Sequence, residues 1–209
     1  MLKYFALFSC VIIPLCLLCI LFIDARLAQT TQEILSHNRF AWEHTRHIPN
    51  ILPFATPVVT ITMVACYLAF RRNPAPAPNF FFLAACSVPV AFFLKVFLQD
   101  AFGRTSIRVW LKTGGQIDFN WFHPLENIGA FPSGHMTVFT AFFFAVWLYY
   151  PSLRMLAVSA VFLLGCALVV TNYHFLGDLF AGIYVGVLVT GGIYSLSDKI
   201  NSKRLLRTS

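Results

Sequence analysis

Charged residues are scarce in this chain of 209 amino acids: they make up 11% of it, and only eight are Asp or Glu. A soluble domain contains about 25% charged residues, so this composition excludes an ordinary soluble domain. Hydrophobic residues account for 58% and include 23 phenylalanines, and the mean hydropathy is +0.74. The chain is therefore predicted to be an integral membrane protein.

Six apolar stretches approach the length needed to cross a bilayer, which is about 20 residues. They are Tyr4–Ile23, Ile51–Phe70, Phe80–Gln99, His135–Tyr150, Leu153–Val170 and Leu179–Leu196. Six helices packed together leave no room for a second domain. We therefore predict an all-α bundle of six transmembrane helices, forming a single domain over residues 1–209.

Basic residues flank the predicted helices on one side, and the loops there are short. They are Lys3, Arg71, Arg72, Arg154, Lys199, Lys203, Arg204 and Arg207. The positive-inside rule makes this side cytoplasmic, so both termini are predicted inside and the longer loops, residues 24–50 and 100–134, outside. This distribution of the net charge of +7 argues against nucleic-acid binding, while the tail suits contact with anionic lipid headgroups.

The six cysteines all fall inside the apolar stretches, which predicts free thiols and no disulfide bonds. They are Cys10, Cys16, Cys19, Cys66, Cys86 and Cys166. Within the last stretch, Gly182 and Gly186 have the spacing that lets helices approach closely, and packing inside the bundle is preferred to dimerisation.

Cations gather around the end of the third apolar stretch. Lys95 lies near its outer end, where the alternatives are a functional cation and a lysine that only reaches out to the interface. Arg104, Arg108 and Lys112 follow at intervals of four and would share one face of a helix. The fork of an arginine side chain matches phosphate oxygens, so this row suits an anionic headgroup.

Pro132-Ser133-Gly134-His135 opens the fourth apolar stretch. Backbone N–H groups at a helix N-terminus form an anion site, and glycine lets the anion come close. His135 is placed to donate a proton to a leaving oxygen. The motif therefore predicts a phosphate site with a general acid.

His174 and Asp178 are four residues apart and would share a helix face. The carboxylate would then hold the imidazole in one tautomer, leaving the other nitrogen to attack phosphorus and form a phosphohistidine. The structural alternative is that His174 caps one helix and Asp178 begins the next.

These elements resemble the three signature motifs of the type 2 phosphatidic acid phosphatase (PAP2) superfamily. The resemblance covers about Lys95 to Gly186 and, with the six-span layout, nearly the whole chain. It implies that His174 is the nucleophile, Asp178 its partner and His135 the general acid. It also implies that phosphate is bound by Lys95, Arg104, Ser133 and Gly134, and that no metal or other cofactor is needed. The scattered carboxylates of the outward side agree with the last point, because they form no cluster for two ions.

The chain departs from this family pattern at two places. The first motif usually has six residues between lysine and arginine and then a proline, whereas here eight intervene and Thr105 follows. Gly103 is predicted to break the helix between them. The third motif usually has an arginine where this chain has Leu168, preceded by Ala167 rather than serine. Absence of this phosphate-binding arginine should weaken transition-state stabilisation by several kcal/mol unless another cation replaces it. Arg108 and Lys112 are the candidates, and we predict that Arg108 is the replacement.

The predicted function is hydrolysis of a lipid phosphate monoester or pyrophosphate through a phosphohistidine. The small size and short loops suggest a bacterial cytoplasmic (inner) membrane, with the site facing the periplasm or outside. The alternatives are a lipid phosphotransferase that uses the same intermediate, and an inactive binder or transporter of lipid phosphates. The identity of the lipid and the oligomeric state stay open.

Two outer loops carry further histidines. His37, His44 and His47 accompany Glu33 and Glu43, in a region, residues 24–49, whose polar and apolar mixture is typical of an interfacial amphipathic segment. That interpretation is preferred to a metal site. His123 is expected to be a solvated loop residue rather than a substrate contact.

Overall fold

The computed structural model describes residues 2–36, 51–74, 76–114, 119–122 and 129–208. The described ranges are helical, and their only β-type pairing is a single bridge between Arg104 and Phe119. The helices are α1 (Leu2–Leu18), α2 (Asp24–Ser36), α4 (Ile51–Phe70), α5 (Ala77–Phe102), α6 (Ile107–Thr113), α7 (Gly134–Tyr149), α8 (Arg154–Val170) and α9 (Leu176–Thr208). A π-helical turn, Cys19–Ile23, joins α1 to α2, and a 3₁₀ turn, Pro151–Leu153, precedes α8.

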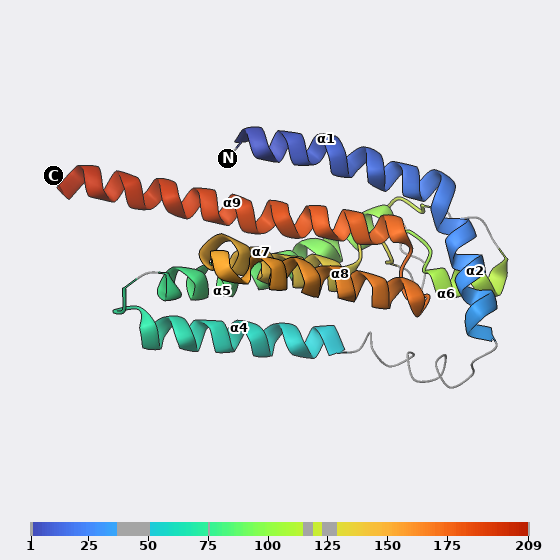
Figure 1. Cartoon of the computed structure of the whole chain (residues 1–209), viewed down its shortest axis with the longest axis horizontal. Coiled ribbons are helices and arrows are strands. Elements are labelled where there is room, and N and C mark those ends of the chain that lie inside the picture. The colour runs from blue at the N-terminus through green and yellow to red at the C-terminus, as the bar shows by residue number, and fades with distance from the viewer. Residues whose placement is uncertain (1, 37–50, 75, 115–118, 123–128, 209) are drawn as a thin grey trace.

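The long helices run side by side along the longest axis of the molecule, with α1 against α9 (Figure 1). The short helices α2 and α6 lie at one end of this bundle. The start of α1, the end of α9 and the connection between α4 and α5 lie at the opposite end. The start of α1 and the end of α9 therefore lie at the same end of the bundle. That this end faces the cytoplasm stays a prediction.

The all-α membrane bundle is confirmed, and a helix lies at each of the six predicted positions. Within the described ranges, four helices are long and apolar enough to cross a membrane: Lys3–Ser36, Ala77–Phe102, Pro151–Val170 and Leu176–Lys199. Phe54–Phe70 and Gly134–Tyr149 are apolar but shorter. The number of crossings, predicted to be six, is therefore not established by helix length alone.

The first helix does not end where its apolar run ends. It continues from Leu18 through the π-helical turn, which ends at Ile23, into α2, which is predominantly polar and lies at an angle to α1 (Figure 1). Ala28 of α2 packs into a buried cluster with Ile107, Trp110 and Phe175. The predicted amphipathic segment is thus helical to Ser36; its remainder, with His37, Glu43, His44 and His47, lies outside the described residues, and Glu33 is exposed.

Helices α7 and α9 touch through two glycines. A Cβ atom on Gly182 would lie 2.7 Å from the Cβ of Met136, and one on Gly186 would lie 2.7 Å from the carbonyl oxygen of Thr137. Any side chain would force the helices apart, so the prediction that these glycines pack inside the bundle is confirmed.

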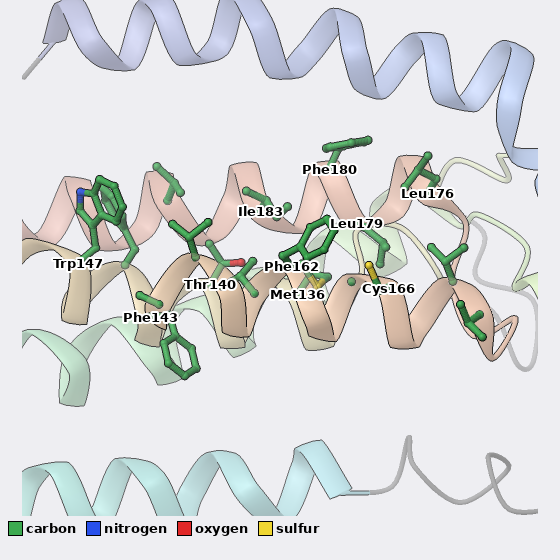
Figure 2. Close-up of a pocket in the computed structure, with 18 residues that line it drawn as sticks. Met136, Thr140, Phe143, Trp147, Phe162, Cys166, Leu176, Leu179, Phe180 and Ile183 are labelled. Carbon is green, nitrogen blue, oxygen red and sulfur yellow. The ribbon is translucent and has the colours of Figure 1, made fainter. Parts of the chain in front are cut away.

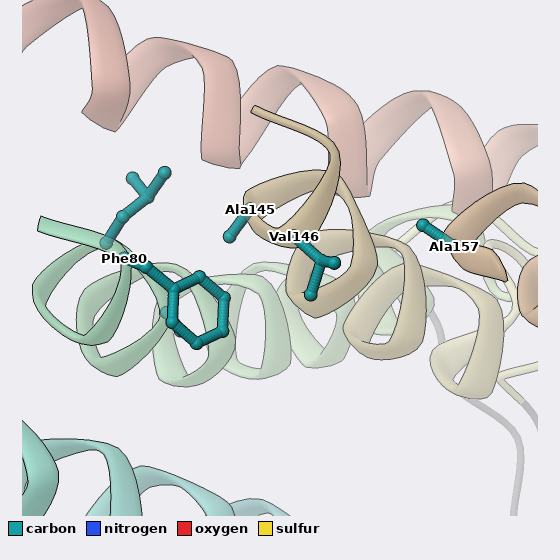
Figure 3. Packing of buried hydrophobic residues seen from close by; sticks show 6 residues of the cluster. Phe80, Ala145, Val146 and Ala157 are labelled. Atoms are coloured by element: carbon teal, nitrogen blue, oxygen red, sulfur yellow. The ribbon is translucent and has the colours of Figure 1, made fainter. Parts of the chain in front are cut away.

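An apolar core fills the end of the bundle where the chain termini lie. Phe80 of α5, Ala145 and Val146 of α7 and Ala157 of α8 are buried together there, as Figure 3 shows. The rings of Phe80 and Tyr150 meet edge to face with centroids 5.2 Å apart. This end contributes packing, while the polar residues that the sequence singled out lie at the other end.

Candidate active site

Three segments that are far apart in the sequence meet at the end of the bundle that carries α2 and α6. They are the last turns of α5, the first turn of α7 and the first turn of α9. The backbone N–H of Ser133 donates to the carbonyl oxygen of Asp178 at 3.0 Å, which joins the second predicted motif to the third. The side chain of Lys95 lies against Gly134, which joins the first motif to the second.

Lys95 and Gly134 are in direct contact. A Cβ atom on Gly134 would lie 3.1 to 3.3 Å from Cδ, Cε and Nζ of Lys95, so a larger residue would crowd the ammonium group. Lys95 Nζ donates to Gln99 Oε1 at 3.1 Å, and Gln99 Nε2 donates to the carbonyl oxygen of Pro132 at 3.0 Å. Gln99, which the sequence did not single out, therefore fixes the ammonium beside the start of α7.

Ser133 is the N-cap of α7, and its hydroxyl accepts a long hydrogen bond from the backbone of Met136 at 3.5 Å. The backbone N–H groups of the following turn point toward the helix N-terminus, where the helix dipole favours an anion. The predicted phosphate cradle thus has its expected helical setting.

His174 does not lie on a helix with Asp178, so the prediction of a shared helix face is wrong. Helix α8 ends at Val170, Asn172 adopts a left-handed backbone (φ 49°), and α9 begins only at Leu176. The pair nevertheless meets across this turn, with His174 Nδ1 3.5 Å from Asp178 Oδ2. The same oxygen accepts the backbone N–H of Phe175 at 3.1 Å. The carboxylate therefore both caps the start of α9 and faces the imidazole.

The rings of the two histidines lie close together. Their ring centroids are 6.2 Å apart, and the ring of Tyr173 lies 5.5 Å from that of His135 and 5.1 Å from that of His174. The guanidinium carbon of Arg108 stands 4.9 Å from the centroid of Tyr173. Arg108 therefore lies against Tyr173, a residue that the sequence did not single out and whose ring is close to both histidines.

Burial raises the pKa of Tyr173 to about 12, although the positive charge of Arg108 opposes this shift. The phenol therefore keeps its proton at neutral pH and is available as a hydrogen-bond donor.

Arg104 does not share a helix with Arg108 and Lys112. Gly103 ends α5 in a left-handed conformation (φ 56°), which confirms the predicted helix break, and α6 begins only at Ile107. Of the predicted row, only Arg108 and Lys112 lie on α6, and Lys112 is exposed.

Arg104 is instead fully buried between two carboxylates. Its Nη2 donates to Asp24 Oδ2 at 2.7 Å, and its Nη1 donates to Asp178 Oδ1. Burial opposes the charge of the guanidinium, but Asp178 and Asp24 outweigh it and raise the pKa of Arg104 above its ordinary value. The group is permanently charged, and both terminal nitrogens are engaged.

Asp24 is a part of the site that sequence reasoning missed. Its Oδ1 accepts the backbone N–H of Gly177 at 3.0 Å, so it holds the first turn of α9 as well as Arg104. Its side chain is fully buried. One feature of the sequence could have indicated its role: Asp24 directly follows a long apolar run. A carboxylate buried at such a place needs a partner, because burying an unpaired charge is costly.

Leu168 stands where the third motif usually has an arginine, and its surroundings are apolar. Leu168 is buried and packs with Met136 and Leu179. Its carbonyl oxygen accepts the backbone N–H groups of Tyr173 at 2.9 Å and His174 at 3.4 Å. Leu168 therefore shapes the turn that presents the nucleophile candidate but supplies no charge.

Among the described residues, no group of three His, Cys, Asp or Glu side chains is arranged to hold a metal ion. His123 lies outside the described residues.

Two apolar cavities adjoin the polar site. One, of about 630 Å³, lies between α7, α8 and α9 and is lined by residues such as Met136, Cys166 and Leu179 (Figure 2). The other, of about 470 Å³, lies between α1, α5 and α9 and reaches Phe131 and Pro132. The lining of the first includes Met136, which follows His135 in the chain, and the lining of the second includes Pro132, which precedes Ser133.

A comparison with known protein families identifies the family of this chain. The PAP2 superfamily matches residues 54–202, which is more than two thirds of the chain. The chain therefore belongs to the PAP2 superfamily, and phosphatase-type activity is the class of chemistry that this family defines. Comparison with curated proteins and with solved structures gives no match.

Proposed function

We propose that the protein is a membrane phosphatase that hydrolyses a lipid phosphate monoester or pyrophosphate through a phosphohistidine on His174. The observation that carries the proposal is the pair of histidines, His135 and His174, with ring centroids 6.2 Å apart. Asp178 stands behind one of them, and Lys95 lies against the turn that precedes the other.

The first step forms a bond between His174 and phosphorus. Because Nδ1 faces Asp178, Nε2 is the nitrogen that attacks. The bond from phosphorus to the leaving oxygen breaks, and His135 gives that oxygen a proton. In the second step water attacks the phosphohistidine, His135 takes a proton from the water, and phosphate leaves with His174 restored.

Charge on the phosphoryl oxygens would be met by fixed positive groups. Lys95 is held by Gln99 beside Gly134, and the first turn of α7 adds backbone N–H groups. We propose that Arg108 supplies the remaining cation in place of the arginine absent at position 168, supported by its position over Tyr173. Such preorganised donors are typically the largest contribution to phosphoryl transfer.

A lipid is the proposed substrate because two apolar cavities, of about 630 and 470 Å³, are lined in part by Met136 and Pro132, which are close in the chain to His135 and Ser133. A headgroup phosphate at the histidines would leave its hydrocarbon portion next to apolar side chains. The proposed site lies at the outer face of the membrane, opposite the end that carries the chain termini, with a bacterial inner membrane as the proposed location.

The first test is phosphate release by the purified, detergent-solubilised protein from a panel of lipid phosphates and pyrophosphates in EDTA. We expect release by the wild type and none above background by His174→Ala. Phosphate release that persists in His174→Ala would contradict the nucleophile. Loss of the lipid phosphate without free phosphate, with transfer to a second lipid, would identify a phosphotransferase instead.

Arg108→Ala tests the replacement of the missing cation. We expect turnover to fall about 10²–10³-fold, as for loss of a single oxyanion donor. Lys112→Ala is the matched control, because Lys112 is on the same helix but exposed; it should retain turnover. Near-normal activity in Arg108→Ala would show that Arg108 does not replace the missing cation.

A further inference from the structure

We infer that Asp24 and Arg104 are positioning residues for the nucleophile: they hold Asp178 in the orientation that presents its second oxygen to His174. This inference rests on the proposed phosphatase function. It assigns a role to Asp24, a residue outside the three motifs. It also gives Arg104 a role different from the phosphate binding that the family resemblance implies.

The contacts of Asp178 divide between its two oxygens. Oδ1 accepts from Arg104 Nη1, while Oδ2 accepts from the backbone of Phe175 at 3.1 Å and faces His174 Nδ1 at 3.5 Å. With one oxygen bound to a guanidinium and the other to a backbone N–H, the carboxylate cannot rotate. Its direction toward the imidazole is therefore fixed by Arg104 on one side and by the start of α9 on the other.

Asp24 fixes Arg104 in turn. A guanidinium presents its donors as a rigid planar fork, and here the two terminal nitrogens bind two different carboxylates. The second oxygen of Asp24 accepts the N–H of Gly177 at 3.0 Å. Asp24 therefore ties Arg104 to the residue directly before Asp178, and the three charged groups form one unit.

The surroundings of Arg104 do not suit a phosphate ligand. The residue has no exposed surface. Its guanidinium carbon lies 4.5 Å from the ring centroid of Phe175 and 5.3 Å from that of Phe119. A phosphate could reach this guanidinium only if the buried side chains around it moved. If the phosphate displaced Asp24 or Asp178, it would also leave a buried carboxylate unpaired.

The variant Asp24→Asn distinguishes a positioning role of Asp24 and Arg104 from phosphate binding by Arg104. The amide keeps the size of the side chain and an oxygen for Gly177, but it loses the charge that binds Arg104. If Asp24 positions the nucleophile, kcat should fall by about 10²-fold, the scale of a small misplacement of a reacting group, while KM changes less than about twofold. If Arg104 instead binds phosphate, its release from Asp24 should lower KM and leave kcat unchanged or higher, and the inference is overturned.

A second readout does not depend on turnover. In protein labelled with ¹⁵N-histidine, NMR distinguishes the tautomers of each imidazole, and His174→Gln identifies the signal of His174. We expect the wild-type His174 to carry its proton on Nδ1, toward Asp178, and a mixture of tautomers in Asp24→Asn. An unchanged single tautomer in Asp24→Asn would overturn the inference, whether or not the lipids offered are hydrolysed.

Two further variants guard against a general loss of structure. Thr190→Val removes a buried hydrogen bond to the carbonyl oxygen of Ala141, 2.9 Å long and between α9 and α7; it should keep kcat and the His174 tautomer. Arg104→Lys keeps one charge but cannot bridge both carboxylates, so it should reproduce the kcat loss and tautomer mixture even if Asp24→Asn does not fold. No phosphate release by the wild type would count against the proposed function, and the tautomers would still decide the positioning role.

Discussion

The two ends of the helix bundle are held together by different forces. At the site end, Asp24, Arg104 and Asp178 are buried and paired. At the opposite end, the buried cluster around Phe80 and Val146 is apolar (Figure 3). In a membrane, lipid tails are as apolar as the side chains, so helix association there depends on close packing and not on the exclusion of water. The packed end should therefore govern stability alone, while the charged end should govern stability and chemistry together.

The largest effect should come from removing the guanidinium at the charged end. Arg104→Met leaves two buried carboxylates without their cation, and breaking a buried ion pair costs about 3–5 kcal/mol. We expect a lower unfolding temperature in detergent micelles and phosphate release close to background. Lys112→Met, which removes an exposed lysine from α6, is the matched control and should change neither quantity.

If Arg104→Met unfolded at the wild-type temperature, the two ends would not differ in the way described. The buried charges would then contribute nothing measurable to stability.

A smaller effect is expected at the packed end. Phe80→Ala removes a buried ring that meets Phe142 and Tyr150 edge to face. We expect a loss of about 2–3 kcal/mol, below the value of about 3–5 kcal/mol for water-soluble cores, because no transfer from water is forfeited. The unfolding temperature should fall while kcat and KM stay at wild-type values. A fall in kcat of the folded protein would show that the packed end also reaches the chemistry.

The smallest of the three effects is expected where α9 packs against the first turn of α7, at the charged end. Gly182→Ala would place a Cβ 2.8 Å from the carbonyl oxygen of Ser133 and 2.7 Å from the Cβ of Met136. The first turn of α7 must then move, at a cost of about 1–3 kcal/mol, and it carries His135. We expect a modest loss of both stability and kcat.

Gly192→Ala is its control on the same helix, since a Cβ there would meet nothing within 4 Å. It should leave activity unchanged. Equal behaviour of the two alanine variants would contradict the close approach of α7 and α9 at the site.

The helices could be predicted from the sequence because a run of apolar residues is a local property. The helix break at Gly103 was predictable for the same reason: glycine adopts the left-handed conformation at little cost. The turn before α9 was harder, because residues 171–175 contain neither glycine nor proline. Only Asn172, a residue type that tolerates left-handed backbone, marks the place where His174 leaves the helix.

The pairing of Arg104 could not be predicted from the sequence. Its spacing to Arg108 and Lys112 suggested a helical row, but Gly103 and the start of α6 at Ile107 separate Arg104 from that row. Its two partners lie 80 and 74 positions away along the chain. A contact of this kind depends on how the start of α2, the end of α5 and the start of α9 pack, and no local pattern encodes it.

The bond between Asp24 and the N–H of Gly177 spans 153 positions of the chain, and this has a consequence for biosynthesis. At about 5–20 residues per second, Asp24 is made about 8 to 30 s before its partner. Until the ribosome has passed the start of the last helix, Asp24 and Arg104 can meet, but the carboxylate of Asp178 and the imidazole of His174 do not yet exist. The proposed catalytic centre is therefore completed only as the final helix enters the bundle, and a chain that stalls earlier lacks both His174 and Asp178.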